Sequence, residues 1–448
     1  MELTIEKLVY GGDGLARLPA DERGRGKAAF VPFVLEGEKV DAVLLEQKPG
    51  FARARAEQIL AASPQRIEAR CPYFGRCGGC NYQHTSYEHQ LEIKAAILRE
   101  NLRRIAKLEL DTELEIHPSP PWNYRNRARL RVHTAPEFAL GYYKINSHEL
   151  LPVEECPISS PLINRAINAM WQMGRAGRVS DRVREIEFFA NADDSQVLTE
   201  VYCSAEIADA AEQFSADFRA ALPEACGIVF VQIRAGKMEA AGDPQRLAVS
   251  GADHLTYQTG RASYRVSAGA FFQVNRHMTD QLVSLVVERR RDGGRDAHRT
   301  AGEDAGATGT ALDLYAGVGL FSSVLNREFE RVIAVESSAT SHADLLYNSP
   351  ANVKAVRSTT EQYLENAAGK LRPDFVVVDP PRSGLGEKVI RGLTKLNAPR
   401  MVYVSCDPAT LSRDLVPLLQ SGYRVQEAHL ADLFPQTYHL ESVFHLVR

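Results

Sequence analysis

The stretch Ala311-Leu312-Asp313-Leu314-Tyr315-Ala316-Gly317-Val318-Gly319 decides the fold of the C-terminal part of this 448-residue chain. It has the pattern of a short apolar strand, a glycine-rich turn and a following helix over 320–325. Such a unit lets a nucleotide come close to the backbone, because glycine has no Cβ. Ser322 stands where a third glycine would complete a dinucleotide-binding pattern, so a dinucleotide cofactor remains one alternative at this point.

Three more apolar runs follow this unit, over 331–335, 375–378 and 401–404, and segments with helical patterns separate them. Near-continuous apolar strands that alternate with helices predict a parallel, doubly wound sheet covered on both faces. In such sheets ligands bind beyond the carboxyl ends of the strands. We therefore look for the chemistry of this chain at those ends.

Acidic residues lie at two of the expected strand ends. Glu336 closes the run 333–336, where a carboxylate can accept both hydroxyls of a ribose. Asp379-Pro380-Pro381-Arg382 follows the run 375–378. Nucleic-acid methyltransferases often have such a tetrapeptide beside the target base, whereas dehydrogenases generally do not. Amino-methylating enzymes usually end it with an aromatic residue, so Arg382 indicates a different chemistry.

Cys406 follows the run 401–404 and precedes Asp407-Pro408, a pair suited to the N-cap and first position of a helix. The positive end of that helix is expected to lower the pKa of the thiol and make it reactive. A buried, inert cysteine is the alternative. Further on, His439 and Glu441 share one face of the expected closing strand. Either could act as a general base, although an edge-strand carboxylate is often merely solvated.

Three cysteines lie within ten residues, at Cys71, Cys77 and Cys80. In a reducing compartment this clustering predicts a metal ion or an iron–sulfur cluster, because disulfide pairing would leave one thiol over. A closed site needs a fourth ligand, and His84 is near in sequence. Cys156 is distant but precedes a proline, a pattern common beside iron–sulfur clusters. The spacing leaves structural zinc and an iron–sulfur cluster both open.

The N-terminal region has short alternating segments broken by glycines, which predict a small β-barrel of the OB type over residues 1–62. Arg125, Arg127, Arg129 and Arg131 would form one row on a strand. Such a row could hold RNA phosphates, or neighbouring acids could neutralise it. The net charge of −4 means that a polyanionic partner would need a local basic patch. No apolar run approaches the roughly 18 residues of a membrane span, and we expect a cytoplasmic monomer.

Six motifs in chain order resemble those of the RNA uracil-C5 methyltransferase family, which makes 5-methyluridine in ribosomal and transfer RNA. The motifs are Gly11-Gly12-Asp13-Gly14-Leu15-Ala16, which is similar to part of a TRAM domain, Cys77-Gly78-Gly79-Cys80, Phe271-Phe272-Gln273-Val274-Asn275, Asp379-Pro380-Pro381-Arg382, Ser405-Cys406-Asp407-Pro408, and Phe434-Pro435-Gln436-Thr437 with His439 and Glu441. The cluster and the barrel together resemble the branch that acts on 23S ribosomal RNA.

The resemblance implies roles for individual residues. It implies a nucleophile at Cys406 and a base at Glu441. It implies a 4Fe-4S cluster on Cys71, Cys77, Cys80 and Cys156. It also implies S-adenosylmethionine contacts by Gln273, Tyr315, Glu336 and Asp379, to which the glycine-rich turn adds Gly317. These residue types suit the reaction, because carbon 5 of uracil becomes nucleophilic only after a thiolate has added to carbon 6, and a base must then remove the carbon 5 proton.

The sequence thus predicts a multidomain α/β enzyme with three parts. These are a TRAM-like barrel over 1–62, a central α+β domain with the iron–sulfur site and the arginine-rich strand over 63–265, and a Rossmann-like methyltransferase domain over 266–448 with a flexible insertion near 292–310. We expect it to methylate a uridine, in 23S rRNA more readily than in tRNA. A non-catalytic RNA-binding assembly factor and a cytosine-C5 DNA methyltransferase are alternatives. The latter usually have Pro before the nucleophile, where this chain has Ser405.

Overall fold

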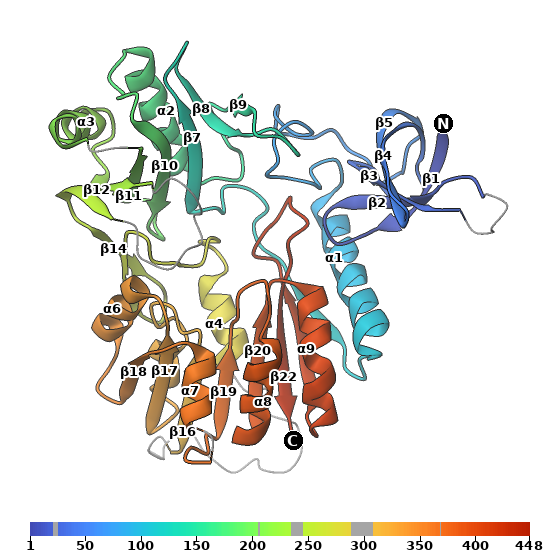
Figure 1. Ribbon diagram of the computed structural model, residues 1–448, viewed down its shortest axis with the longest axis vertical. Helices are drawn as coiled ribbons and strands as arrows, with labels where there is room; N and C mark the ends of the chain where they lie inside the picture. Colours follow the sequence, from blue (N-terminus) through green and yellow to red (C-terminus); the bar gives the residue numbers. More distant parts are fainter. Residues whose placement is uncertain (21–25, 205–206, 234–244, 288–307, 368) are drawn as a thin grey trace.

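The computed structural model describes residues 1–20, 26–204, 207–233, 245–287, 308–367 and 369–448. Figure 1 shows the predicted methyltransferase domain, called the methyltransferase region below, at the bottom, a second lobe at the upper left and a small barrel at the upper right. Most of the insertion expected near 292–310 lies outside the described residues. In the described part of the chain, no helix has both the length and the apolar character needed to cross a membrane.

The N-terminal segment forms the expected barrel. Five strands close it in the order β1-β2-β3-β5-β4. They are β1 (Glu2–Leu8), β2 (Asp13–Arg17), β3 (Ala28–Pro32), β4 (Lys39–Gln47) and β5 (Phe51–Ala61). Alternate residues of β1, such as Leu3 and Ile5, are buried inside the barrel, as period-two patterning requires.

The second lobe is a seven-stranded sheet of order β13-β12-β11-β10-β7-β8-β9. Its strands are β7 (Arg127–His133), β8 (Ala139–Tyr143), β9 (Leu150–Pro152), β10 (Val183–Ala190), β11 (Val197–Cys203), β12 (Ala225–Gln232) and β13 (Arg246–Gly251). Helices α2 (Pro161–Arg175) and α3 (Ala208–Ala221) cover one face. The other face packs with the hairpin of β14 (His254–Gln258) and β15 (Ser263–Ser267) in a core that continues into the methyltransferase region.

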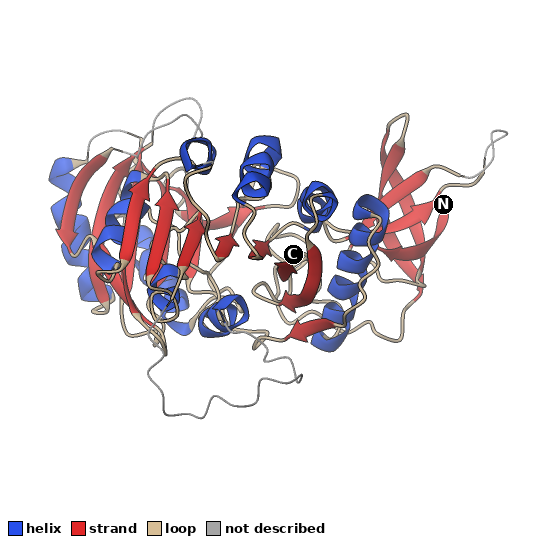
Figure 2. Ribbon diagram, turned by 90° about the horizontal axis from the view of Figure 1, so that it is seen from below, coloured by secondary structure: helices blue, strands red, loops and turns tan. Residues whose placement is uncertain are grey.

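The methyltransferase region is built on an eight-stranded sheet of order β18-β17-β16-β19-β20-β22-β21-β6 (Figure 2). Its strands are β16 (Thr310–Leu314), β17 (Arg331–Glu336), β18 (Val353–Arg357), β19 (Phe375–Val378), β20 (Arg400–Ser405), β21 (Arg424–Ala431), β22 (Glu441–Val447) and β6 (Leu114–His117). The five strands from β18 to β20 are parallel, as predicted, whereas β22 pairs antiparallel with both β20 and β21.

Two separate cores cover the faces of this sheet. Along β19, for example, Phe375 and Val377 face one core, and Val376 and Val378 face the other. Helices α4 (Thr279–Val287), α5 (Ser322–Leu325) and α6 (Ala339–Asn348) contribute to the first core. Helices α1 (Tyr87–Asn101), α7 (Thr360–Ala367), α8 (Gly386–Leu396) and α9 (Pro408–Gln420) contribute to the second. Both faces are therefore buried, which explains the near-continuous apolar strands.

The segment 87–117 joins the methyltransferase sheet although it precedes the seven-stranded sheet in sequence. Helix α1 packs beside α9, and a π-helical turn, η1 (Leu102–Ala106), extends it (Figure 1). Strand β6 then pairs in parallel with the edge strand β21. The central domain predicted over 63–265 thus contributes one strand to the sheet that bears the expected active site and one helix that packs on it. The boundaries at 62 and 265 stay predictions.

Candidate active site

The glycine-rich turn after β16 lines a small groove at the carboxyl end of the sheet. Tyr315, Gly317 and Gly319 all adopt positive φ angles, of 64°, 57° and 93°. A Cβ on Gly319 would lie 2.8 Å from Leu345 Cδ1, so the turn requires glycine there for space as well as for conformation. Tyr315 accepts a conformation that is costly for a bulky residue, as is common at ligand sites.

Four of the five predicted cofactor residues border this groove. Gln273, Tyr315, Gly317 and Asp379 line a cavity of about 30 Å³. Glu336 holds the turn from behind, because its carboxylate accepts hydrogen bonds from the Gly317 N–H at 2.9 Å and the Ser338 N–H at 2.7 Å. That volume equals roughly one water molecule, so the groove must widen for a nucleoside to enter. Phe271, which also lines it, is 62% exposed.

The pairing of β20 with β22 brings Cys406 and Glu441 together. Ser405 at the end of β20 pairs with Ser442 near the start of β22, and the Ser442 hydroxyl donates to the Ser405 carbonyl at 3.1 Å. Because the two strands run antiparallel, Cys406, which follows Ser405, and Glu441, which precedes Ser442, lie at the same end of this pair. They therefore meet at the carboxyl end of the parallel strands. Glu441 is buried, and Cys406 is partly exposed.

The sequence predicted a lowered pKa for the Cys406 thiol, and this prediction was wrong. Burial, followed by the Glu441 and Asp379 carboxyls, raises the pKa of Cys406 to about 12, although Arg382 opposes this. The helix end does not compensate, because the Asp407 carboxylate caps it by accepting from the Ala409 and Thr410 N–H groups at 3.0 and 2.9 Å. The resting thiol is therefore protonated at neutral pH.

The carboxyl groups around the thiol also hold protons more tightly than usual. Burial and the nearby Asp313 carboxyl raise the pKa of Asp379 to about 7. Burial and Asp379 raise the pKa of Glu441 well above its ordinary value. Asp313 lies within β16 and is fully buried, where its own pKa rises to about 7 through burial. Carboxyl groups from β16, from the end of β19 and from β22 thus lie close together. The ionised form of one carboxyl group raises the pKa of its neighbour.

His439 is a weaker candidate for the base than Glu441. Burial and the cations Arg382, Lys94 and Arg125 lower the pKa of His439 to about 3. The Arg382 guanidinium lies 3.3 Å from both ring nitrogens. A base with so low a pKa gains little by accepting a proton near neutral pH, whereas ionised Glu441 would be a strong base.

Helix α1 positions the loop that leads to Glu441, through two contacts that the sequence did not reveal. The Lys94 ammonium donates to Asp432 at 2.6 Å and to the Phe434 carbonyl at 2.9 Å, and both charged side chains are fully buried. The Gln90 side chain donates to Gln436 Oε1 at 3.0 Å and accepts from the Gln436 N–H at 2.9 Å. These bonds attach the motif 434–437 to α1.

The barrel also reaches the site. The Tyr10 hydroxyl donates to the Cys406 carbonyl at 3.0 Å, and its ring meets Tyr438 edge-on at 5.3 Å. The contact joins residues 396 positions apart in sequence. The glycine motif at 11–14 follows Tyr10 directly and was the only local signal near it.

The four cysteines of the predicted cluster share one wall of a large cleft. Cys71, Cys77, Cys80 and Cys156 all line a cavity of about 930 Å³. Burial and the mutual repulsion of the thiols raise the pKa of Cys77 to about 11 and that of Cys80 higher still. His84 does not belong to this group, because its ring stacks on Phe74 and its Nε2 lies 3.3 Å from the Val34 carbonyl.

The arginine row on β7 is paired with acids of the neighbouring strand. Arg129 and Arg131 both donate to Glu185, and Arg127 lies 3.6 Å from Glu187. Three of the four guanidinium groups also lie over aromatic rings, with Arg127 4.0 Å from the centre of Phe189. Neighbouring acids therefore neutralise Arg127, Arg129 and Arg131, whereas Arg125, which precedes β7, donates to the Arg127 carbonyl at 2.9 Å.

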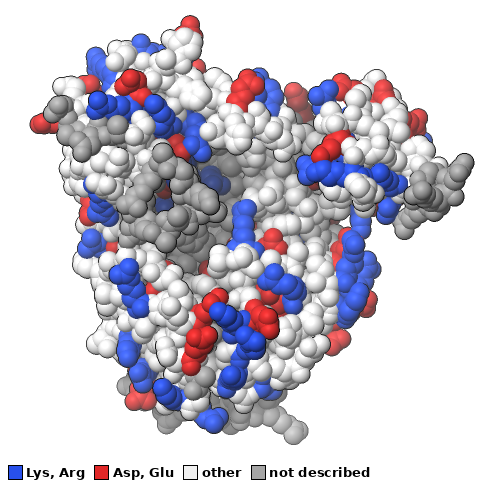
Figure 3. Space-filling model, viewed as in Figure 1, with Lys and Arg blue, Asp and Glu red and all other residues white. Residues whose placement is uncertain are grey.

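The large cleft is nonetheless basic. Figure 3 shows this face of the molecule hollowed between the barrel and the second lobe, with Lys and Arg side chains around the hollow. The charged residues that line the cleft are Arg53, Arg125, Arg129, Lys144 and Arg382, against Asp13 and Glu155. Arg129 and Lys144 are paired with Glu185 and Glu149, and Arg53 lies 3.7 Å from Glu46. The local excess of cations therefore comes from Arg125 and Arg382, where the barrel, the cysteines and the loop 434–439 meet.

A doubly wound sheet with a glycine turn, an acidic residue on the next strand and a thiol beside a carboxyl fits the predicted class, an S-adenosylmethionine-dependent methyltransferase. The family model described as tRNA (Uracil-5-)-methyltransferase matches residues 86–448, and the model of the TRAM domain matches residues 1–56. The chain therefore belongs to the S-adenosylmethionine-dependent RNA uracil-C5 methyltransferase family and carries an N-terminal TRAM domain.

Relatives cover nearly the whole chain. An uncharacterised RNA methyltransferase of Aquifex aeolicus is 33% identical over 99% of this chain and 97% of its own length. The 23S rRNA (uracil(1939)-C(5))-methyltransferase RlmD of Pseudomonas fluorescens is 31% identical over 98% of this chain and 92% of its own. Among solved structures, the tRNA (uracil-54, C5)-methyltransferase of Pyrococcus abyssi in complex with S-adenosyl-L-homocysteine has the same fold, with a TM-score of 0.73, 23% identity and full coverage of both chains.

Proposed function

We propose that this enzyme methylates carbon 5 of a uridine in 23S rRNA through a covalent adduct between Cys406 and carbon 6 of the base. The observation that carries the mechanism is the meeting of Cys406 and Glu441 at the paired ends of β20 and β22. A thiol and a carboxyl side by side are the two groups that addition and elimination at a uracil ring require.

The reaction proceeds in three steps. The partly exposed Cys406 thiol gives its proton to solvent and its sulfur bonds to carbon 6, while the electrons of the C5–C6 double bond move toward the carbonyl oxygen at carbon 4. Carbon 5 then takes the methyl group that S-adenosylmethionine supplies, with S-adenosylhomocysteine as the product. Glu441 finally removes the proton from carbon 5, the double bond forms again, and the C6–S bond breaks to release Cys406.

Glu441 must be ionised before it can accept that proton. Burial and the neighbouring Asp379 oppose its ionisation in the free enzyme. A positively charged methyl donor in the groove, whose wall includes Asp379, offsets that repulsion. The arrangement thus couples occupation of the cofactor groove to the activation of the base.

The choice of 23S rRNA is supported by the similarity to the 23S rRNA methyltransferase RlmD of Pseudomonas fluorescens, which is 31% identical over 98% of this chain. The tRNA enzyme of similar fold is 23% identical and supports the architecture alone. The cleft of about 930 Å³ between the barrel and the second lobe would hold the RNA that flanks a uridine turned out of its stack. Mapping 5-methyluridine in 23S rRNA and tRNA from cells with and without the gene tests the choice. Loss of a 5-methyluridine from tRNA alone would contradict it.

The cysteine cluster fits an iron–sulfur group better than a single zinc ion. All four candidate ligands are thiols that line one cavity, and Cys156 precedes a proline, a pattern common beside iron–sulfur clusters. Cys71, Cys77, Cys80 and Cys156 would hold a 4Fe-4S cluster, which ties the segment 71–80 to the region before α2. Anaerobically purified protein should contain about four irons per chain, and Cys80→Ser should lose them. Stoichiometric zinc without iron would contradict the assignment.

A further inference from the structure

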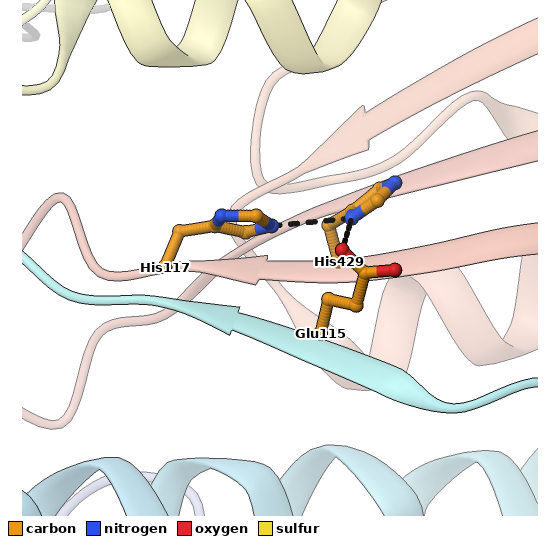
Figure 4. Close-up of side chains that lie close together, drawn as sticks. All are labelled: Glu115, His117 and His429. Carbon is orange, nitrogen blue, oxygen red and sulfur yellow. Dashed lines mark hydrogen bonds and ion pairs between the residues drawn. The ribbon is translucent and has the colours of Figure 1, made fainter. Parts of the chain in front are cut away.

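The edge of the methyltransferase sheet carries a cluster of imidazoles and carboxylates, on the two strands beside the one that bears Glu441. Figure 4 shows Glu115 and His117 of β6 converging with His429 of β21. The parallel pairing places Glu115 directly opposite His429, and His117 is two residues further along, so all three side chains lie on one face. His429 is buried, and the Glu115 side chain is 25% exposed.

We infer that Glu115, His117 and His429 form a binding site for a divalent transition-metal ion, with zinc the best match, which joins β6 to the methyltransferase sheet. One atom of each residue contributes, and the three atoms all lie within 4.8 Å of one another. His117 Nε2 is 3.2 Å from His429 Nδ1, which in turn is 3.7 Å from Glu115 Oε2.

These distances match the ligands of a single ion. Nitrogen and oxygen ligands at about 2.0–2.2 Å from a tetrahedral zinc lie about 3.3–3.6 Å apart. Two imidazoles and one carboxylate are a common set for zinc, and the fourth position would be open to water. Glu115 and His117 are both half-buried, which gives the ion a route from solvent.

The outward nitrogens of both imidazoles have the partners that metal-bound histidines usually have. His429 Nε2 lies 3.3 Å from Glu427 Oε2, so it can donate its proton there and leave Nδ1 with a lone pair. His117 Nδ1 lies 3.0 Å from the Gln281 side-chain amide of α4, which can turn its oxygen toward a donor. Burial and the neighbouring imidazoles of His445 and His117 lower the pKa of His429, which favours the neutral ring.

A second group, formed by Glu427, His429 and His445, shares the same central histidine. The ring of His429 cannot present lone pairs on both sides while it is neutral. We assign the ion to the β6 side because that group bridges a four-residue edge strand to the sheet. A strand so short gains much from a cross-link. His445 then serves as a matched control, since it lies on the opposite side of His429.

The test is a titration of the full-length protein with cobalt(II) alone, with its own iron–sulfur site undisturbed, followed by calorimetry and visible absorption. Wild-type protein should bind one equivalent whose spectrum has ligand-field bands but no sulfur-to-cobalt charge transfer. His117→Ala should lose this equivalent, Glu115→Gln should bind it at least tenfold more weakly, and His445→Ala should retain it. Zinc should raise the Tm of wild type and not that of His117→Ala.

Equal cobalt binding by wild type and His117→Ala would overturn the assignment. Loss of the ion in His445→Ala with retention in His117→Ala would also overturn it, because the ion would then lie on the other side of His429. If His117→Ala fails to fold, the conservative Glu115→Gln decides, since its side chain is partly exposed and keeps its size. The readouts are metal binding and thermal stability, so none of them depends on the proposed reaction.

Discussion

The buried ion pair between Lys94 and Asp432 gives a prediction whose size follows from the structure. Both side chains have 0% exposure, and the ammonium also donates to the Phe434 carbonyl. Lys94→Met keeps much of the volume but leaves the Asp432 carboxylate without its cation. Removing one partner of a fully buried pair costs about 3–5 kcal/mol, because the remaining charge is uncompensated.

The expected fall in Tm follows from that cost. A domain of 150–250 residues loses about 2–4 °C per kcal/mol, so Lys94→Met should lower the Tm by about 6–20 °C. It should also reduce methyl transfer, since the loop that leads to Glu441 loses its attachment to α1. Thermal unfolding and a tritium-release assay with 5-tritiated uridine RNA measure the two effects.

Two further variants make the test specific. Lys395→Met, at an exposed position of α8, is the matched control and should change stability by less than about 0.5 kcal/mol. The double variant Lys94→Met, Asp432→Asn removes both charges and should recover much of the lost stability. A single variant as stable as the control, or a double variant no better than the single one, would refute the reasoning.

Three other predictions concern the cofactor groove, the barrel and the arginine row. Because the pKa of Asp379 is about 7, its carboxyl becomes ionised as pH rises, so the affinity for cationic S-adenosylmethionine should increase from about pH 6 to 8; binding measured by calorimetry should lose this dependence in Asp379→Asn. Tyr10→Phe removes the hydrogen bond to the Cys406 carbonyl, worth about 0.5–1.5 kcal/mol, and should lower kcat by about two- to tenfold while cofactor affinity stays unchanged; an unaltered kcat would mean that the contact is incidental. Arg131→Gln removes a guanidinium that Glu185 already neutralises, so the salt dependence of RNA binding should change by less than the unit slope of a phosphate contact; a loss of a full unit would show that RNA displaces Glu185.

Much of the fold could be predicted because its signals are local. The apolar runs over 375–378 and 401–404 are buried on both faces, and any sequence with that pattern must cover both sides of a sheet. Asp407 and Pro408 begin α9 as expected, since capping depends only on neighbouring residues. The barrel follows in the same way from alternation and glycine turns.

The rest depends on contacts that cross the sequence. The pKa of Cys406 could not be predicted from the helix that follows it, because Asp379 and Glu441 arrive from two other strands. The attachment of Lys94 to Asp432 spans 338 residues and has no local pattern. The partners of the arginine row depend on the register of β7 against β10, which places Arg129 opposite Glu187 and Arg131 opposite Glu185.

The covalent adduct tests the central claim most directly. In Glu441→Gln the amide cannot accept the carbon 5 proton, so addition and methyl transfer proceed while elimination stalls. Incubation with substrate RNA and labelled S-adenosylmethionine should then give a methylated enzyme–RNA species that survives a denaturing gel. The species should be absent from Cys406→Ala and from the double variant Cys406→Ala, Glu441→Gln. An adduct that persists without Cys406, or normal turnover by Glu441→Gln, would contradict the account.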